Sequence, residues 1–403
     1  MMVDHADQPL CSNDRAGGAG RIALAHDWIV ARRGGELVLD AIADALLSRA
    51  NPCEITRLYT MFHAGVPISE RIDALPVTVS PLGRLPAPLR RWLLPAYPAA
   101  ARSLTRVLAR DHSESPIDLL VSTSSVAAKA IRPPAGVPHL CYCHTPARYL
   151  WSQGDQYGGG GVKGLARGAG LALFRGRLRR WDRDTSAHVS VFVANSSHTR
   201  EQIRLAYDRD ALVIHPPVRT DFFTPDPGVP RCGSLLVVSA LEPYKRVDLA
   251  IDAAACAGRP LTIIGAGSHE RALRAHAART ANAEVTFVGR ADDDAVRDAM
   301  RRAWAFLMPQ TEDFGITCVE AQACGTPVVA RGAGGALDTV IDGQTGTLIG
   351  SEDAGDWADA IRAINPPDLA ISCRANAERF GAERFGSAIS ALVDACSNRE
   401  VGG

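Results

Sequence analysis

The stretch Glu312-Asp313-Phe314-Gly315-Ile316-Thr317-Cys318-Val319-Glu320 decides the fold of the C-terminal half of this chain. An apolar strand candidate at 305–308 leads into it, and a helix is predicted to begin near Ile316. The first N–H groups of a helix have no partner inside the helix, so a strand–loop–helix junction favours anion binding. We therefore predict a ligand at four backbone N–H groups, those of Phe314, Gly315, Ile316 and Thr317.

Two glutamates frame this helix start. Glu312 in the loop can accept hydrogen bonds from the hydroxyls of a sugar. Glu320 lies four residues after Ile316, on the same face of the helix, and can accept two hydroxyls of a ribose. The alternatives are a helix cap at 312–313 and an ordinary surface glutamate at 320. The glycine-rich residues 332–335 that follow favour the binding interpretation.

Working outward, short apolar runs alternate with amphipathic helical stretches along the whole chain. This alternation predicts an α/β fold with parallel sheets covered on both faces. One series of strand candidates comprises residues 21–25, 55–59, 117–122, 139–143 and 189–194. A second series comprises residues 235–239, 261–264, 284–288, 305–308 and 327–330.

A proline cluster separates the two series. Pro216, Pro217, Pro225, Pro227 and Pro230 cannot continue a helix or a central strand, so they indicate a linker between two domains. We predict a disordered leader at 1–20, an N-terminal domain at 21–215 and a C-terminal domain at 216–375. A final helix at 376–403 is expected to pack back on the N-terminal domain.

Composition excludes several classes of protein. Lys plus Arg equals Asp plus Glu, at 44 each, which argues against general nucleic-acid binding. The ten cysteines form no CxxC pair and indicate buried thiols in a reducing cytosol. No apolar run is long enough to span a bilayer, and the first 20 residues have no apolar core of a secretory signal. These features predict a cytoplasmic protein.

Two further motifs follow strand candidates in the C-terminal half. Lys245 and Arg246 come just before a predicted helix, where cations are unfavourable unless an anion answers them, so they indicate a diphosphate clamp. The alternative is a solvated basic pair. Gly265 opens a Gly-x-Gly turn after the strand at 261–264, and it is equally consistent with a nucleotide contact and with a tight turn.

These motifs resemble a known family. Ser-Ala-Leu-Glu-Pro-Tyr-Lys-Arg at 239–246, Glu-Asp-Phe-Gly-Ile-Thr-Cys-Val-Glu at 312–320 and Gly-Thr-Pro-Val-Val-Ala at 325–330 are similar to those of retaining GT-B glycosyltransferases of the group-1 (family-4) class. The resemblance covers about residues 21–395. It implies two Rossmann-like, doubly wound domains facing a cleft. It also implies that Lys245 grips the diphosphate of a nucleotide sugar, Glu312 the donor sugar and Glu320 the ribose.

The chain departs from the family at one point of the diphosphate site. Many members carry an arginine five residues before the lysine, where this chain has Ala240. Arg246 is the residue that can substitute for that charge.

The N-terminal half adds a glycine turn and a histidine to the resemblance. Gly34 and Gly35 open a predicted helix after the first strand and its His26-Asp27-Trp28 continuation, and in the family such a turn faces the donor diphosphate. The alternative is a flexible turn. His144 follows the strand at 139–143 and resembles the histidine near the donor sugar, although a lone histidine is usually structural. The run His-Thr-Pro-Ala-Arg-Tyr-Leu-Trp at 144–151 is similar to the mannosyltransferase-like branch that builds surface glycans.

Two arginine-rich stretches, at 84–110 and 163–181, combine basic residues with leucine and tryptophan. Such segments suit an anionic membrane surface, with solvated helix faces as the alternative. They favour a lipid-linked or polysaccharide acceptor and a peripheral position on the inner face of the membrane. The four glycines at 158–161 predict a mobile loop.

The resemblance implies a metal-independent hexosyltransferase that needs no cofactor and uses a GDP- or UDP-linked sugar, with mannose as one candidate. No enzymic nucleophile is evident, so front-face displacement is carried over from the family. The triplet Asp292-Asp293-Asp294 opens a predicted helix, and we interpret it as an N-cap rather than a metal site. The other function classes are a non-catalytic nucleotide-sugar-binding protein and a GT-B epimerase or phosphorylase.

Overall fold

The computed structural model describes residues 20–31, 34–86, 93–151, 162–282 and 284–397. Side chains are described from residue 173 onward within the helix that begins at Val162. The predicted leader, apart from Gly20, and the glycine run at 158–161 lie outside the described residues. So do Arg90, Arg91 and the side chains of Lys163 and Arg167 from the two basic stretches.

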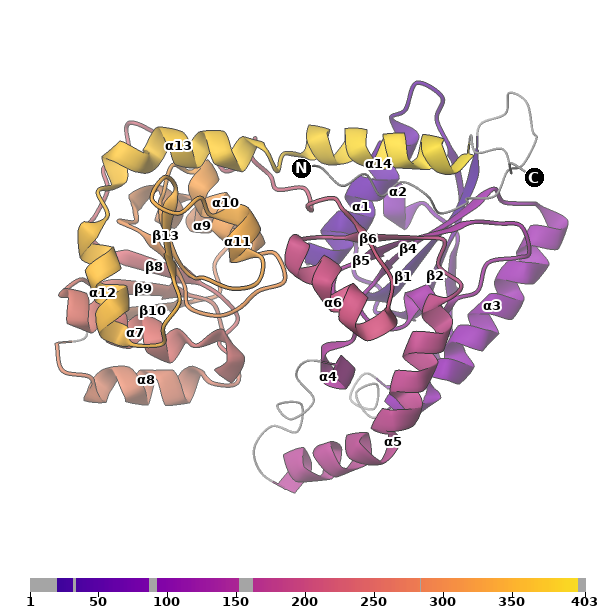
Figure 1. Ribbon diagram of the computed structural model, residues 1–403, viewed down its shortest axis with the longest axis horizontal. Helices are drawn as coiled ribbons and strands as arrows, with labels where there is room; N and C mark the ends of the chain where they lie inside the picture. The colour runs from indigo at the N-terminus through magenta and orange to yellow at the C-terminus, as the bar shows by residue number, and fades with distance from the viewer. Residues whose placement is uncertain (1–19, 32–33, 87–92, 152–161, 283, 398–403) are drawn as a thin grey trace. The chain divides into compact units, whose positions relative to one another are not determined.

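The chain forms two compact units. The first contains residues up to Asn195, Thr199–Ile214 and the chain from Phe385 onward. The second contains Ser196–His198 and His215–Arg384. Figure 1 shows an α/β architecture in each, with helices around a central sheet.

The first unit is built on a seven-stranded sheet of order β3-β2-β1-β4-β5-β6-β7, in which all neighbours are parallel. Its strands are β1 (Arg21–Ile29), β2 (Glu54–His63), β3 (Val77–Val79), β4 (Leu119–Ser124), β5 (His139–Cys143), β6 (Val191–Ala194) and β7 (Leu212–Val213). The strand order reverses between β1 and β4, which is where an open α/β sheet places its loops on opposite sides and leaves a crevice.

Helices cover both faces of this sheet. Leu39, Ile42 and Leu46 of α1 (Gly34–Leu47) pack with Phe385 and Ile389 of α14 (Ala382–Ser397) on one face. The chain's last helix therefore completes the core of the first unit. The other helices of the unit are α2 (Glu70–Asp73), α3 (Tyr97–Glu114), α4 (Arg148–Trp151), α5 (Val162–Ser186) and α6 (Ser197–Tyr207), whose first two residues fall in the second unit. Short 3-10 turns are η1 (Pro81–Arg84), η3 (Leu94–Ala96) and η4 (Ala128–Ala130).

The second unit has a six-stranded parallel sheet of order β10-β9-β8-β11-β12-β13. Its strands are β8 (Leu235–Val238), β9 (Leu261–Ile264), β10 (Val285–Gly289), β11 (Phe306–Met308), β12 (Val328–Arg331) and β13 (Gly346–Ile349). The strand order reverses between β8 and β11, so this sheet has a crevice position of the same kind as the first.

Two apolar cores flank the second sheet. The core that contains the fully buried Trp357 involves α7 (Val247–Ala257), α8 (Glu270–Arg279) and α12 (Ala354–Ala363). The opposite core involves α9 (Asp293–Arg302), α10 (Ile316–Ala323), α11 (Ala336–Thr339) and α13 (Pro366–Glu378). A short 3-10 turn, η5 (Pro243–Lys245), follows β8. The predicted class, two Rossmann-like doubly wound domains, is thus confirmed.

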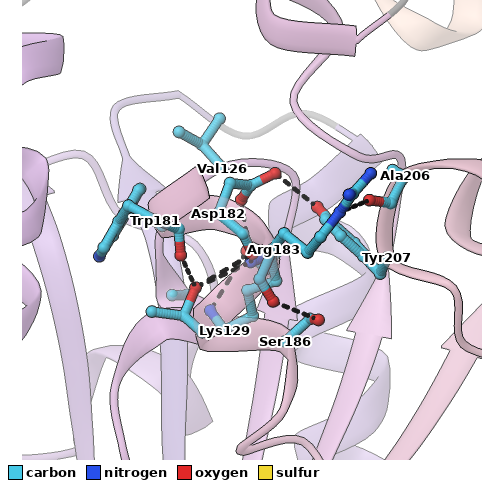
Figure 2. A network of polar contacts seen from close by, with 12 residues as sticks. Val126, Lys129, Trp181, Asp182, Arg183, Ser186, Ala206 and Tyr207 are labelled. Atoms are coloured by element: carbon cyan, nitrogen blue, oxygen red, sulfur yellow. Dashed lines mark hydrogen bonds and ion pairs between the residues drawn. The ribbon is translucent and has the colours of Figure 1, made fainter. Parts of the chain in front are cut away.

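A buried ion pair joins several elements of the first unit (Figure 2). The Lys129 ammonium lies 2.9 Å from a carboxylate oxygen of Asp182, and both side chains are buried. The other carboxylate oxygen accepts hydrogen bonds from the Trp151 indole at 2.7 Å and the Tyr207 hydroxyl at 3.0 Å. Lys129 also donates to the carbonyl of Asp182 at 2.6 Å. The pair therefore ties η4, α4 and α6 to α5, so this lysine is a structural one.

The strand and helix predictions differ from the structure mainly at strand ends. The first strand was expected to stop at residue 25, but β1 continues to Ile29, so His26 and Asp27 lie inside a buried strand and not in the loop after it. The prediction missed β3, β7 and β13, which have two to four residues each and lie at or next to sheet edges. Such short segments carry little periodicity. No described helix is long and apolar enough to cross a membrane.

Candidate functional site

The strongest candidate site lies where the strand order reverses in the second sheet. β8 and β11 are neighbours, although β9 and β10 come between them in the sequence. The loop after β8 carries Lys245, and the loop after β11 carries Glu312. Because both strands are parallel, these loops leave the same edge of the sheet and bring the two side chains together.

Lys245 and Glu312 form a close ion pair between these loops. The same carboxylate oxygen of Glu312 accepts a hydrogen bond from the amide of Gln310 at 2.9 Å. The Lys245 ammonium also lies 5.0 Å from the ring centre of Tyr244. The predicted sugar-binding carboxylate and the predicted phosphate-binding ammonium are therefore direct neighbours, each holding the other in place.

The start of α10 lies at the next step along the chain. Gly315 has a φ of 92°, a left-handed conformation that favours glycine, and α10 begins at Ile316 as predicted. No side chain in the described structure caps this helix. The first backbone N–H groups, those of Ile316 and Thr317, therefore lack the usual side-chain acceptor and can serve an anion.

The glycine-rich residues 332–335 support this loop. The Gly335 N–H donates to the carbonyl of Glu312 at 2.8 Å. A Cβ at Gly334 would lie 2.3 Å from that carbonyl oxygen, and one at Gly335 would lie 2.3 Å from the Cα of Phe314. Only glycine allows this close approach, so the motif fixes the backbone that carries Glu312.

Glu320 is the second carboxylate of the site. Its residue is 9% exposed, and no hydrogen bond to its carboxylate occurs within the part of the chain that the structure describes. Arg219 approaches to 4.0 Å. The pKa of Glu320 is raised to about 7, mainly by burial, which outweighs the opposing charge of Arg219 and is assisted by Asp293. A buried carboxylate without hydrogen-bond donors is suited to accept hydroxyls from a ligand.

Arg246 was predicted to share the diphosphate with Lys245. Its φ is 49°, and its guanidinium contacts Glu352 at 2.8 Å and Asp248 at 3.4 Å. These two carboxylates raise its pKa, so its charge is already matched within the protein. The diphosphate role of Arg246 stays a prediction.

Gly265 has a structural explanation that the sequence did not reveal. Its φ is 141°, and a Cβ there would lie 1.8 Å from the carbonyl oxygen of Ser239. Nearby, the carboxylate of Glu242 accepts hydrogen bonds from the backbone and hydroxyl of Ser268. The turn after β9 therefore packs directly against the loop after β8. Its contact with a nucleotide stays a prediction.

In the first unit, the structure brings the predicted His144 close to the predicted glycine turn. A Cβ at Gly35 would lie 3.7 Å from Nε2 of His144 and 3.6 Å from the ring of His26. His144 Nε2 is buried and has no hydrogen-bond partner in the described residues. The pKa of His144 is lowered to about 4, mainly by burial and to a smaller extent by His26, with Asp27 acting in the opposite direction. The ring is therefore neutral at pH 7 and offers one unpaired nitrogen.

Asp27 occupies the position where the strand order reverses in the first sheet. Its two carboxylate oxygens accept four backbone hydrogen bonds of 2.5–2.8 Å. The donors are the N–H groups of Ser125, Val126, Ala127 and Ala128 in the loop after β4. A ring of N–H groups that resembles an anion site is thus already filled by the protein itself.

Sequence reasoning missed Gln310, Asp27 and Arg219. Gln310 lies in the loop predicted before α10, but the sequence assigned it no role. Arg219 lies within the predicted proline-rich linker and was not considered as a site residue. The N-cap interpretation of the aspartate triplet is confirmed, since Asp292 accepts a hydrogen bond from the N–H of Ala295 at 2.8 Å. Among the described residues, no group of three or more His, Cys, Asp or Glu side chains is placed to hold a metal.

Comparisons with known families agree with this geometry. Residues 233–379 match the family described as glycosyl transferases group 1, and residues 32–222 match Glycosyltransferase Family 4. Together the two matches include every strand of the second sheet and every strand of the first sheet except β1. The second unit is thus similar to the group-1 glycosyl transferases and the first unit to Glycosyltransferase Family 4, in a GT-B type of fold.

Individual relatives narrow the class no further. A D-inositol 3-phosphate glycosyltransferase of Mycolicibacterium smegmatis is 32% identical over 204 residues, 46% of this chain and 47% of that protein. The chain thus matches about half the length of its curated relatives. Sucrose-phosphate synthase of Thermosynechococcus elongatus superposes with a TM-score of 0.71 at 18% identity, over 93% of this chain and 98% of the other. Anabaena HepE in complex with UDP-glucose gives 0.65 at 21% identity, over 93% and 99%. These structural likenesses show the fold.

Proposed function

We propose that this protein is a glycosyltransferase whose C-terminal unit binds a nucleotide-diphosphate sugar. The observation that carries the proposal is the Lys245–Glu312 pair between the loops after β8 and β11, beside the uncapped start of α10. A cation, free N–H groups and carboxylates are the groups that a diphosphate with sugar hydroxyls requires. The two family matches support the same class.

The proposed roles follow from the charges. Without a ligand, Lys245 and Glu312 neutralise each other. When a diphosphate binds, the Lys245 ammonium pairs with it and no longer with Glu312. The Glu312 carboxylate keeps its hydrogen bond from Gln310 and can then accept hydrogen bonds from the sugar hydroxyls. As the bond from the sugar to the diphosphate breaks, negative charge grows on the diphosphate. Lys245 and the N–H groups at the start of α10 then stabilise that charge at fixed positions.

The remaining roles concern the ribose and the reacting centre. Glu320 accepts the ribose hydroxyls, because its buried carboxylate has no donor of its own in the described protein. His144 serves the reacting sugar as a neutral hydrogen-bonding group. Gly35 keeps the start of α1 free of a side chain near that ring.

We propose mannose from GDP-mannose as the first donor to test, on a lipid-linked or polysaccharide acceptor. The basis is the resemblance of residues 144–151. UDP-glucose is the matched alternative, because HepE has been crystallised with it. D-inositol 3-phosphate is the alternative acceptor, given the names of the relatives. Retention of configuration, absence of a metal requirement and peripheral membrane association belong to the same proposal.

The direct test is donor turnover by the purified protein. Each donor is incubated with each acceptor, with and without EDTA, and products are identified by mass spectrometry and the anomeric configuration by NMR. The proposal expects transfer from at least one donor, unchanged by EDTA and with retained configuration. Absence of transfer and of donor hydrolysis for every pair contradicts the proposed activity.

A second candidate is a nucleotide-sugar-binding protein without transferase activity. The observation that favours it is the weakened diphosphate site, with alanine at position 240 and the Arg246 charge matched by Glu352 and Asp248. Donor binding by calorimetry without transfer or hydrolysis supports this candidate. An Ala240→Arg variant separates the two, because restored charge should increase turnover only if the chain is an enzyme.

A further inference from the structure

Arg219 lies on a segment of the second unit that is firmly held. The neighbouring Val218 forms a parallel bridge with Gly381 and donates its N–H to the carbonyl of Phe380 at 2.8 Å. The Arg219 carbonyl accepts the N–H groups of Phe222 and Phe223 at 3.1 and 2.9 Å. The backbone that presents this arginine therefore cannot shift without breaking several contacts.

The guanidinium is held as well. Its central carbon lies 5.1 Å from the ring centre of Phe222 and 5.2 Å from that of Phe223. One nitrogen donates to a carboxylate oxygen of Asp293 at 2.7 Å. The other terminal nitrogen lies 4.0 Å from Oε1 of Glu320. Arg219 is thus placed between two carboxylates and hydrogen-bonded to one of them.

This asymmetry matters for Glu320. A free arginine fork commonly pairs with a carboxylate through two parallel hydrogen bonds, which would occupy the acceptor oxygens. At 4.0 Å there is no hydrogen bond, but the positive charge still acts on the carboxylate. Asp293 holds the fork away, so Glu320 receives the charge of Arg219 and keeps its oxygens free for a ligand.

We propose that Arg219, anchored by Asp293, is the positioning residue that makes Glu320 an acceptor for the vicinal hydroxyls of a ribose. The inference rests on the proposed function, and it assigns to Arg219 and Asp293 a role in selecting ribonucleotides. The class of ligand is a ribonucleoside diphosphate, recognised through its 2′- and 3′-hydroxyls. Arg219 itself does not touch the reacting atoms.

The test is calorimetric binding of two pairs of probes to the whole protein: UDP and its 2′-deoxy form, and GDP and its 2′-deoxy form. The base that binds more tightly is then used throughout. Wild-type protein should prefer the ribonucleotide by about tenfold, the ratio that a loss of about 1.4 kcal/mol represents. Glu320→Gln should abolish most of this preference. Arg219→Met should do the same while leaving deoxynucleotide affinity nearly unchanged, and Arg219→Lys should restore part of it.

Arg297→Met is the matched control. Arg297 lies over the same Phe222 ring at 4.5 Å, but its ion pairs are with Asp294 and Asp298. It should keep the ribose preference, whereas a merely structural role of Arg219 predicts equal loss for both nucleotides. If Arg219→Met keeps the wild-type preference while Glu320→Gln loses it, the inference is wrong and the proposed function stands. If the wild-type protein binds none of the four probes, or binds the ribonucleotide and its 2′-deoxy form equally, the proposed ribose site and this inference are both wrong.

Discussion

The two sheets reverse their strand order at equivalent points, yet the two positions are filled in opposite ways. At β1 and β4, Asp27 saturates four backbone N–H groups with its own carboxylate. At β8 and β11, Lys245 pairs with Glu312, Gln310 donates to the same carboxylate, and Glu320 has no hydrogen-bond donor among the described residues. One point is satisfied by the protein, and the other has binding capacity left for a ligand. The same topology therefore serves structure in one unit and, as we propose, recognition in the other.

The largest effect, a loss of stability, is expected at Asp27, where the protein itself fills the reversal point of the first sheet. Asp27→Ala removes the acceptor of four backbone N–H groups, and buried unsatisfied donors cost about 1–3 kcal/mol each. We expect the free energy of unfolding of the first unit to fall by about 4 kcal/mol, measured by urea denaturation. Asp353→Ala is the control, because Asp353 caps the exposed start of α12 with two such bonds and should cost only about 1 kcal/mol. Equal losses in the two variants would remove the contrast.

The next effect is expected at the open point and should appear in activity. Lys245→Ala should lower donor turnover by about 10²–10³-fold, the usual cost of one preorganised group that stabilises developing charge. Its melting temperature should fall far less than its activity, because Gln310 still donates a hydrogen bond to Glu312 after the ammonium is removed. Arg246→Ala should have a smaller effect on turnover, since Glu352 already matches that charge. Wild-type turnover in Lys245→Ala would disprove the clamp.

Lowering the pH should destabilise the first unit, which contains Asp27 and two buried histidines. Burial lowers the pKa of His26 to about 4 and that of His139 to about 3, whereas both titrate near 6.5 when unfolded. Their contribution to stability is complete above about pH 6.5 and is lost as the pH falls toward the folded values, because the unfolded state binds the protons first. Between pH 6.5 and 5 each histidine should reduce the free energy of unfolding by about 2 kcal/mol. His26→Gln should lessen that slope, and an unchanged slope would contradict the assignment.

The smallest effect is expected from the titration of Glu320. Its pH dependence of stability has the opposite sign to that of the two histidines. Burial raises its folded pKa to about 7, so the folded state retains the proton and its stability contribution falls as the pH rises from the unfolded value toward 7. Ribonucleotide binding needs the ionised acceptor, so affinity should rise up to about tenfold from pH 6 to 8. Glu320→Gln should remove this rise. An identical pH profile in both proteins would show that Glu320 does not bind the ribose.

The sequence predicted features that depend on local patterns better than contacts between residues far apart in the chain. The alternating pattern identified both sheets, and the boundaries of β5, β9 and the start of α10 agree with the structure. Local motifs also predicted Lys245, Glu312 and Glu320 as site residues. The structure places Lys245 beside Glu312, because parallel strand ends place their loops at one edge of a sheet. Which of these groups would be paired was not predictable from local pattern.

The missed residues act over long sequence separations. Asp27 meets its donors about 100 residues away, and Arg219 meets Asp293 across 74. Neither contact leaves a signal in one sequence, since a lone aspartate at a strand end and an arginine in a linker are ordinary. The two short close approaches at Gly265 and Gly335 were likewise invisible, because a glycine motif does not reveal which backbone it touches.

The most direct test of the open point is nucleotide binding by titration calorimetry. Wild-type protein, Lys245→Ala and Glu320→Gln are each titrated with UDP, GDP, UDP-glucose and GDP-mannose at pH 8. The account predicts that at least one of these binds the wild-type protein, and that its affinity falls by about tenfold or more in each variant while both remain folded. Equal affinity in all three proteins, or no binding to the wild-type protein, would contradict it.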